Sequence, residues 1–246
     1  MTFLLFLAAV WAGAQNALAG GGSFVTLPML ILSGLDARAA NIASTLALFP
    51  GQVSTGLVGR KLVGGAAGLS FRVLMGISVV GGALGAGLLL LTPSHFFARL
   101  VPWLVLFATG LFAWGSFFRK PGPEGHSLPP LVAAGLQFLI ALYGGYFGGG
   151  IGFLMLAALT AAGVAVRQAG ATKNVLASVM NAGAVAIFLF TPAIPWSRVA
   201  VVCLGAIIGG YVGAKLLQRV DERLIRGFVV VLGCALTVGL FLRGAG

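Results

Sequence analysis

The sequence predicts an all-α polytopic membrane protein with two inverted-topology repeats of about four helical segments each. Three observations carry this prediction: an apolar composition, long runs without charge, and an internal repeat. Hydrophobic types make up 59% of the 246 residues and charged types 8%, with a mean hydropathy of +1.09. Soluble domains carry about 25% charged residues and disordered chains still more, so the composition excludes both classes. A β-barrel would show alternating segments, whereas the apolar runs here are unbroken.

Eight charge-free runs of membrane-crossing length follow one another along the chain. Roughly 20 helical residues cross a bilayer, and six of the runs fit one crossing each, some with a terminal Arg or Lys that would snorkel. The first and fifth are too long for one crossing, and each contains three consecutive glycines, which predicts a helix-break-helix hairpin. The runs are 2–34, 39–59, 73–98, 100–118, 128–166, 174–197, 199–214 and 227–242.

The first run resembles a secretory signal in one respect, because MTFLLFLAAVWAGAQNALAGG ends in a small-residue cleavage pattern. It lacks the positively charged start of such signals. It also has a counterpart in the second half of the chain. We therefore expect it to be retained as the first membrane segment.

Matched features at a nearly constant offset predict the repeat. The triplets 20–22 and 148–150 are 128 positions apart, and Arg38 and Arg167 are 129 apart. VGGALGAGLL at 80–89 matches IGGYVGAKLL at 208–217, again at 128. We expect an N-terminal transmembrane repeat over 1–118, a polar linker over 119–127 and a C-terminal transmembrane repeat over 128–246.

The basic residues indicate how the halves are oriented. Eight simple spans would place seven bases on each side of the membrane, with no positive-inside bias. If each of the two long runs instead returns to its starting side, ten basic residues lie on one side of the membrane and four on the other. Both termini then face outward, and the two repeats have inverted orientations. The ten are Arg60, Lys61, Arg72, Arg119, Lys120, Arg167, Lys215, Arg219, Arg223 and Arg226. The four are Arg38, Arg99, Arg198 and Arg243.

The sequence offers no sign of catalysis, metal binding or a cofactor. All four acids lie in predicted connections, and Cys203 and Cys234 form no CxxC motif. Without a base beside a nucleophile, an enzyme is the poorest interpretation. The net charge of +11 comes from scattered bases beside apolar runs, so we expect membrane lipid rather than nucleic acid as a partner.

One span carries a charge. Lys173 lies near the start of the helix expected after Gln168, and no other charge follows for 24 residues. A lysine at a helix end often only snorkels to the interface. Its neighbours favour a functional role, because two repeat-related polar faces that meet around one cation would suit an anion. These faces comprise Thr172, Lys173, Asn174 and Asn181 in the second half and Asn41, Ser44, Thr45 and Gln52 in the first.

The glycine breaks add to this prediction. A helix that restarts after a break presents free N–H groups and a positive dipole end, which bind anions. Close packing through small residues is the competing explanation, and it fits other glycines of the chain better. We therefore predict that the breaks, Gly20, Gly21, Gly22, Gly148, Gly149 and Gly150, supply backbone donors to a substrate.

At these residues the chain resembles the TauE/SafE family of membrane anion exporters, across nearly its whole length. The resemblance is carried by AGGGSFVTLPML (19–30), ANIASTLALFPG (40–51), YGGYFGGGIGFLML (143–156), TKNVLASVMNAGAVAIF (172–188), PW (195–196) and LGAIIGGYVGAKL (204–216). The family commonly has Thr where Ala43 stands and often Asn at the position of Gly170. The resemblance implies export of sulfur-containing anions such as sulfite, sulfoacetate or related organosulfonates from the bacterial cytoplasm.

The function expected from these observations is a transporter of the bacterial inner membrane that exports a small oxyanion by alternating access between the repeats. Two alternatives stay open: an importer of a related anion such as thiosulfate, and a membrane scaffold without a substrate. The sequence leaves the coupling ion and a possible homo-oligomer undetermined.

Overall fold

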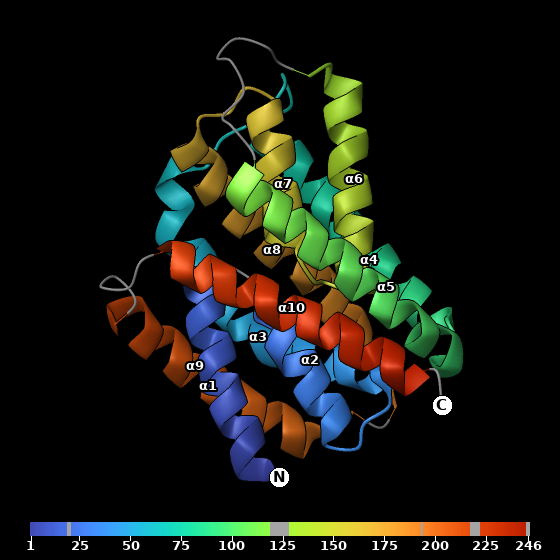
Figure 1. Ribbon diagram of the computed structural model, residues 1–246. Coiled ribbons are helices and arrows are strands. Elements are labelled where there is room, and N and C mark those ends of the chain that lie inside the picture. Colours follow the sequence, from blue (N-terminus) through green and yellow to red (C-terminus); the bar gives the residue numbers. More distant parts are fainter. Residues whose placement is uncertain (19–20, 119–127, 193, 217–221, 245–246) are drawn as a thin grey trace.

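The structure is a computed structural model that describes residues 1–18, 21–118, 128–192, 194–216 and 222–244. Within these ranges every regular element is a helix, so the predicted all-α class is confirmed (Figure 1). The predicted linker 119–127 lies outside the described residues. The elements are α1 (Thr2–Leu18), α2 (Ser23–Leu32), α3 (Ala37–Gly59), η1 (Arg60–Leu62), α4 (Phe71–Leu91), α5 (Ser94–Ala113), η2 (Trp114–Phe118), α6 (Pro130–Tyr146), α7 (Ile151–Ala161), α8 (Val166–Phe188), α9 (Trp196–Leu216) and α10 (Glu222–Gly244).

Three helices in the described residues are long and apolar enough to cross a membrane: α4, α5 and α8. The two over-long runs are divided instead, since α1 is followed by the shorter α2, and α6 by the shorter α7. This pattern confirms a helical membrane protein in which the first segment of each half is interrupted.

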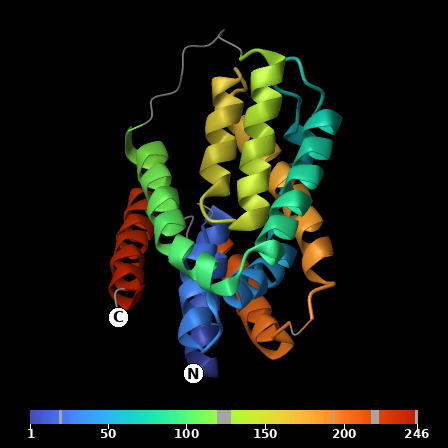
Figure 2. The same ribbon diagram turned by 90° about the vertical axis from the view of Figure 1, so that its right-hand side faces the viewer.

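Both interruptions fall where the glycines predict them. Gly21, Gly148 and Gly150 have φ values of 82°, 81° and 75°, in the left-handed region that residues with a Cβ adopt only at a cost. The chain therefore leaves the helix at these points and starts a new helix, α2 or α7. Figure 2 shows that α6 and α7 occupy the upper part of the molecule and α1 and α2 the lower part, with the breaks between them.

The two halves interleave instead of packing as separate bodies. α4 of the first half packs against α6 and α8 of the second, while α9 of the second packs against α1 and α3 of the first. α3 crosses α8, and α5 lies along α10. Each of these contacts has its counterpart under the 128-residue offset, as a pseudo-twofold arrangement requires. The inverted orientation of the repeats and their boundaries stay predictions.

Glycines allow the closest of these helix crossings. A Cβ at Gly85 would overlap the Leu142 carbonyl of α6, and one at Gly209 would overlap the Val10 carbonyl of α1. In the repeated motifs at 80–89 and 208–217, Gly209 corresponds to Gly81, which lies about one helical turn before Gly85 on α4. Small residues at helix interfaces let backbones approach, so here the packing explanation for glycine holds.

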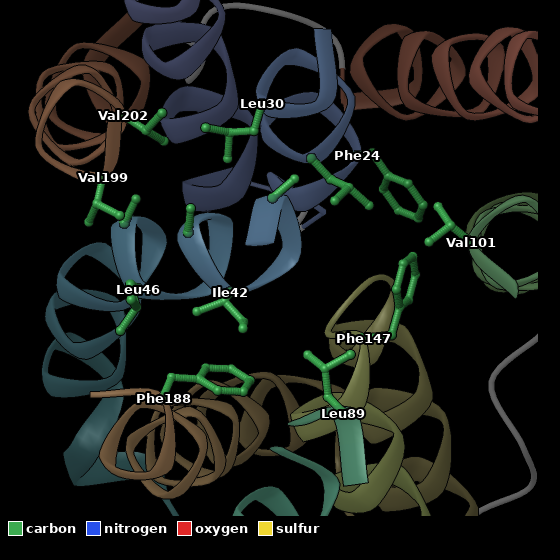
Figure 3. Packing of buried hydrophobic residues seen from close by; sticks show 14 of the residues in the cluster. Phe24, Leu30, Ile42, Leu46, Leu89, Val101, Phe147, Phe188, Val199 and Val202 are labelled. Carbon is green, nitrogen blue, oxygen red and sulfur yellow. The ribbon is translucent and has the colours of Figure 1, made fainter. Parts of the chain in front are cut away.

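The apolar core fills the space between the two broken hairpins and the long helices. Figure 3 shows Leu30 beside Val202 of α9, and the rings of Phe24 and Phe147 converging toward Val101 of α5. All of these side chains are buried in one cluster. The core therefore fixes the first turn of α2 and the second break relative to α5.

Candidate anion site between the two glycine breaks

The two breaks, far apart in sequence, line one pocket. Its empty volume, including the part open to solvent, is about 560 Å³. Five segments contribute: the end of α1, the start of α2, α3, the second break with the start of α7, and α8. The lining residues are Asn16, Gly21, Ser23, Gln52, Thr55, Gly148, Gly150, Ile151, Gly152, Lys173, Asn174 and Ala177.

Two helices begin at this pocket. The N-cap residues of α2 and α7 are Gly22 and Gly150, which have no side chain to cap the first-turn N–H groups. The Gly22 N–H donates to Asn16 Oδ1 at 3.4 Å. Ser23 begins α2 and Ile151 begins α7, and N–H groups at these positions have no acceptor within their own helix. The N-termini of two helices, each with a partial positive charge, therefore lie at the pocket.

Lys173 adds a full charge to the same place. It lies half-buried on α8, and its Nζ is 3.4 Å from the position that a Cβ at Gly152 would take. The ammonium therefore sits against the first turn of α7, where glycine leaves room for it. No acidic side chain is among the described residues that line the pocket, so its electrostatic character is positive.

A hydrogen-bonded crossing of α3 and α8 forms the back of the pocket. Asn181 Nδ2 donates to Gln52 Oε1, which joins two positions that the sequence matches at an offset of 129. The Ser178 hydroxyl donates to the carbonyl oxygens of Gln52 and Asn174, at 2.7 and 2.8 Å. Repeat-related residues meet here, as they would near a pseudo-twofold axis.

Several predicted residues lie outside the pocket and hold neighbouring segments. The Thr172 hydroxyl accepts from the Gly64 N–H at 3.2 Å. Asn41 Nδ2 donates to the Tyr146 carbonyl at 3.1 Å and so supports the end of α6 beside the second break. Ser44 is hydrogen-bonded to Thr26 of α2, with 2.6 Å between the two hydroxyl oxygens.

The remaining predicted residues take intermediate places. Asn181 lies behind Gln52, Thr45 is half-buried on α3, and Gly149 lines a neighbouring apolar pocket. Gly22 is buried and accepts from the Thr26 hydroxyl at 3.2 Å, while Gly20 falls outside the described residues. Six predicted residues line the pocket: Gly21, Gln52, Gly148, Gly150, Lys173 and Asn174. A substrate-binding role stays a prediction for the whole predicted set.

The predicted set did not contain Asn16, Ser23 or Thr55, which also line the pocket. Thr55 follows Gln52 by three residues and therefore shares its helix face, a signal that was available. Ser23 is the first residue after the glycines, where a restarted helix exposes its N–H groups. The contribution of Asn16 depends on how far α1 extends before it breaks.

Comparison with known proteins identifies the family. A family-wide sequence model described as "Sulfite exporter TauE/SafE" matches residues 5–240, nearly the whole chain. The chain belongs to the TauE/SafE family.

Similar TauE/SafE-type sequences are named as membrane transporters. "Probable membrane transporter protein ORF9" from Sinorhizobium sp is 29% identical, and the alignment covers 96% of this chain and 90% of the relative. A "probable membrane transporter protein" from Haemophilus influenzae is 30% identical over 95% and 92%. "Probable membrane transporter protein YfcA" from Escherichia coli is 28% identical over 96% and 88%. The chain is a membrane transporter of the TauE/SafE type.

Proposed function

We propose that this transporter exports a small sulfur-containing oxyanion, such as sulfite, sulfoacetate or a related organosulfonate, across the bacterial inner membrane. The observation that carries the proposal is the pocket in which Lys173 and the N-termini of α2 and α7 come together. The family description supports both the sulfur anion and the direction of transport.

Each part of the pocket has a role in binding such an anion. The Lys173 ammonium supplies the compensating charge, and the first turns of α2 and α7 supply backbone donors. The amides of Gln52 and Asn174 supply neutral hydrogen bonds and fix the orientation of the oxyanion. A bound anion thereby replaces its hydration shell with donors that the fold already holds in place.

Alternating access follows from the position of the pocket between the two broken hairpins. The start of α2 belongs to one half and the start of α7 to the other, so relative movement of the halves opens the pocket to one side of the membrane at a time. Lys173 on α8 and Gly152 on α7 both belong to the second half, so we expect the lysine and the start of α7 to move together and to keep the anion between them.

Thermal unfolding of the purified protein in the presence of sulfite and sulfoacetate tests the proposal. Binding to the native state stabilises it by an amount that grows with the ratio of ligand concentration to Kd, and so raises the unfolding midpoint. We expect Lys173→Gln to abolish the shift, Lys173→Arg to retain part of it, and Arg167→Gln to leave it unchanged. Arg167 is the matched control, because it is an exposed cation that precedes Lys173 by less than two turns on the same helix.

Transport in proteoliposomes completes the test. We expect wild-type protein and Arg167→Gln to move sulfite or a sulfonate down its gradient, and Lys173→Gln to move neither. An anion-induced shift of equal size in Lys173→Gln and wild type would remove the lysine from the site. The absence of binding and transport for every sulfur anion tried would refute the proposed function.

A further inference from the structure

Two polar side chains of α3 line the pocket between the two glycine breaks, hereafter the anion pocket. Gln52 and Thr55 are three residues apart and are therefore neighbours on one face of the helix. Each side chain already forms a hydrogen bond within the protein. These bonds determine which of their polar atoms are left for a ligand.

Gln52 is left with hydrogen-bond donors. Its Oε1 accepts from Asn181 Nδ2, so the hydrogens of its own Nε2 remain for the pocket. Asn16 on α1 follows the same pattern, because its Oδ1 accepts from the Gly22 N–H at 3.4 Å. Both amides therefore add donors to those of Lys173 and the two helix N-termini.

Thr55 is left with an acceptor. Its hydroxyl donates to the Gly51 carbonyl oxygen at 2.9 Å, and a carbonyl can only accept, so the single hydroxyl hydrogen is directed away from a ligand. Only the lone pairs of Oγ1 remain. An oxyanion without a proton would bring its own lone pairs against this oxygen, whereas an O–H group would donate to it. Gln52 and Thr55 thus present a donor and an acceptor side by side.

The rest of the lining offers few competitors for a proton on the ligand. Lys173 of α8 is the one titratable side chain among the described residues that line the pocket. α1, α2 and α7 contribute neutral residues, namely Asn16, Ser23, Ile151 and Gly152, and the two side chains from α3 are neutral as well. No carboxylate or imidazole in this part of the lining competes with the Thr55 hydroxyl as an acceptor.

We infer that the anion pocket binds hydrogen sulfite, the protonated monoanion, in preference to the sulfite dianion, and that Thr55 is the residue that distinguishes them. One oxygen of the anion accepts from Gln52 Nε2, while the neighbouring O–H donates to Thr55 Oγ1. This inference rests on the proposed function and narrows its substrate to an oxyanion that carries its own donor. Each exported sulfite then takes one proton and one negative charge across the membrane.

The pH dependence of binding in lipid nanodiscs tests the inference. Sulfite takes up a proton near neutral pH, so at higher pH the dianion replaces hydrogen sulfite. We expect the affinity for total sulfite to fall about tenfold for each pH unit above the pKa of sulfite, because one proton must be taken up on binding. Methanesulfonate, a monoanion at every pH used, is the control ligand. Its affinity should stay constant over the same range.

Substitutions on α3 test the role of Thr55. The readout is the ratio of sulfite to methanesulfonate affinity below the pKa of sulfite, measured by calorimetry within each variant. We expect Thr55→Val to lower this ratio about tenfold, because the ligand's O–H loses its acceptor, and Thr55→Ser to retain most of it. Ser54→Ala is the matched control, because Ser54 is the adjacent hydroxyl on α3, is exposed and lies outside the anion pocket. It should leave the ratio unchanged.

Each contrary result is recognisable. Lys173-dependent binding of sulfite with equal affinity on both sides of its pKa would refute the preference for hydrogen sulfite and leave the proposed function intact. A parallel loss of sulfite and methanesulfonate affinity with rising pH would assign the titration to the protein and overturn the inference. An unchanged ratio in Thr55→Val would remove Thr55 as the distinguishing residue. Failure of both anions to bind the wild type would refute this inference together with sulfite as the exported anion.

Discussion

At the scale of single residues, the crossing of α3 and α8 depends on amides that pair with each other. Gln52 lines the anion pocket, and its side-chain carbonyl accepts from Asn181, which is buried at 3% exposure. Loss of one partner leaves the other amide without its hydrogen bond, whereas loss of both removes the polar groups together. The pair therefore couples the lining of the pocket to the contact between the two halves.

We predict that Asn181→Leu and Gln52→Leu each lower the free energy of unfolding by about 1 kcal/mol. In the double variant we expect a loss about 1 kcal/mol smaller than the sum of the two single losses. Reversible unfolding in mixed micelles measures all four proteins of the cycle. Thr55→Val in place of Gln52→Leu is the control, because the Thr55 hydroxyl donates to the Gly51 carbonyl of its own helix instead. Additive effects of Gln52→Leu and Asn181→Leu would contradict a direct interaction.

At the scale of helices, α4 is held against α6 through glycine. Gly85 is buried beneath the Leu142 carbonyl, while Gly87, two residues on, has no atom within 4 Å of the position of a Cβ among the described residues. The same substitution at these two positions therefore meets different surroundings on one helix. The contrast separates the packing of glycine from its low helix propensity.

We predict that Gly85→Ala lowers the free energy of unfolding by about 2 kcal/mol, because the added methyl group forces the two helices apart. Gly87→Ala should be neutral or stabilising by up to about 1 kcal/mol, through its higher helix propensity. Thermal unfolding of both variants beside the wild type measures the difference. Equal effects at the two positions would show that the α4–α6 contact does not need glycine.

At the scale of the whole molecule, the reciprocal packing of the halves fits a repeated architecture, and the orientation of the repeats decides how the protein sits in the membrane. Inverted repeats place equivalent connections on opposite sides. Asp36 and Ala165 are equivalent under the 129-residue offset, are both exposed, and immediately precede α3 and α8. They are therefore suitable reporters of topology.

We predict that a membrane-impermeant maleimide applied to intact spheroplasts labels Asp36→Cys, and labels Ala165→Cys only after permeabilisation. Both reporters are placed in a background in which Cys203 and Cys234 are replaced by Ala. The excess of basic residues on the side of Ala165 sets this direction. Labelling of both reporters from the same side would establish parallel repeats and remove the inverted arrangement.

The sequence predicted the elements better than the site. It located both helix breaks, because three consecutive glycines are a local property of the chain and the resulting backbone angles need no distant partner. It also placed polar residues on shared helix faces and assigned all of them to the site. In the structure, however, Thr172 is hydrogen-bonded to Gly64 in a connection and Asn41 to Tyr146 at the end of α6, and neither lines the pocket. A helix places several polar side chains on one broad face, and packing with its neighbours decides which of them reach a cavity.

The sequence by itself determined the helical membrane class, the interrupted segments and the position of Lys173, since composition, local backbone preference and the rarity of charge in apolar runs do not depend on the fold. Only the tertiary structure showed that the two breaks, which are 128 residues apart in sequence, line the same pocket, and that Lys173 lies beside Gly152. It also placed an apolar pocket beside them. These features arise from how α3 crosses α8 and how the two hairpins meet, and such long-range contacts are fixed by the packing of the whole chain.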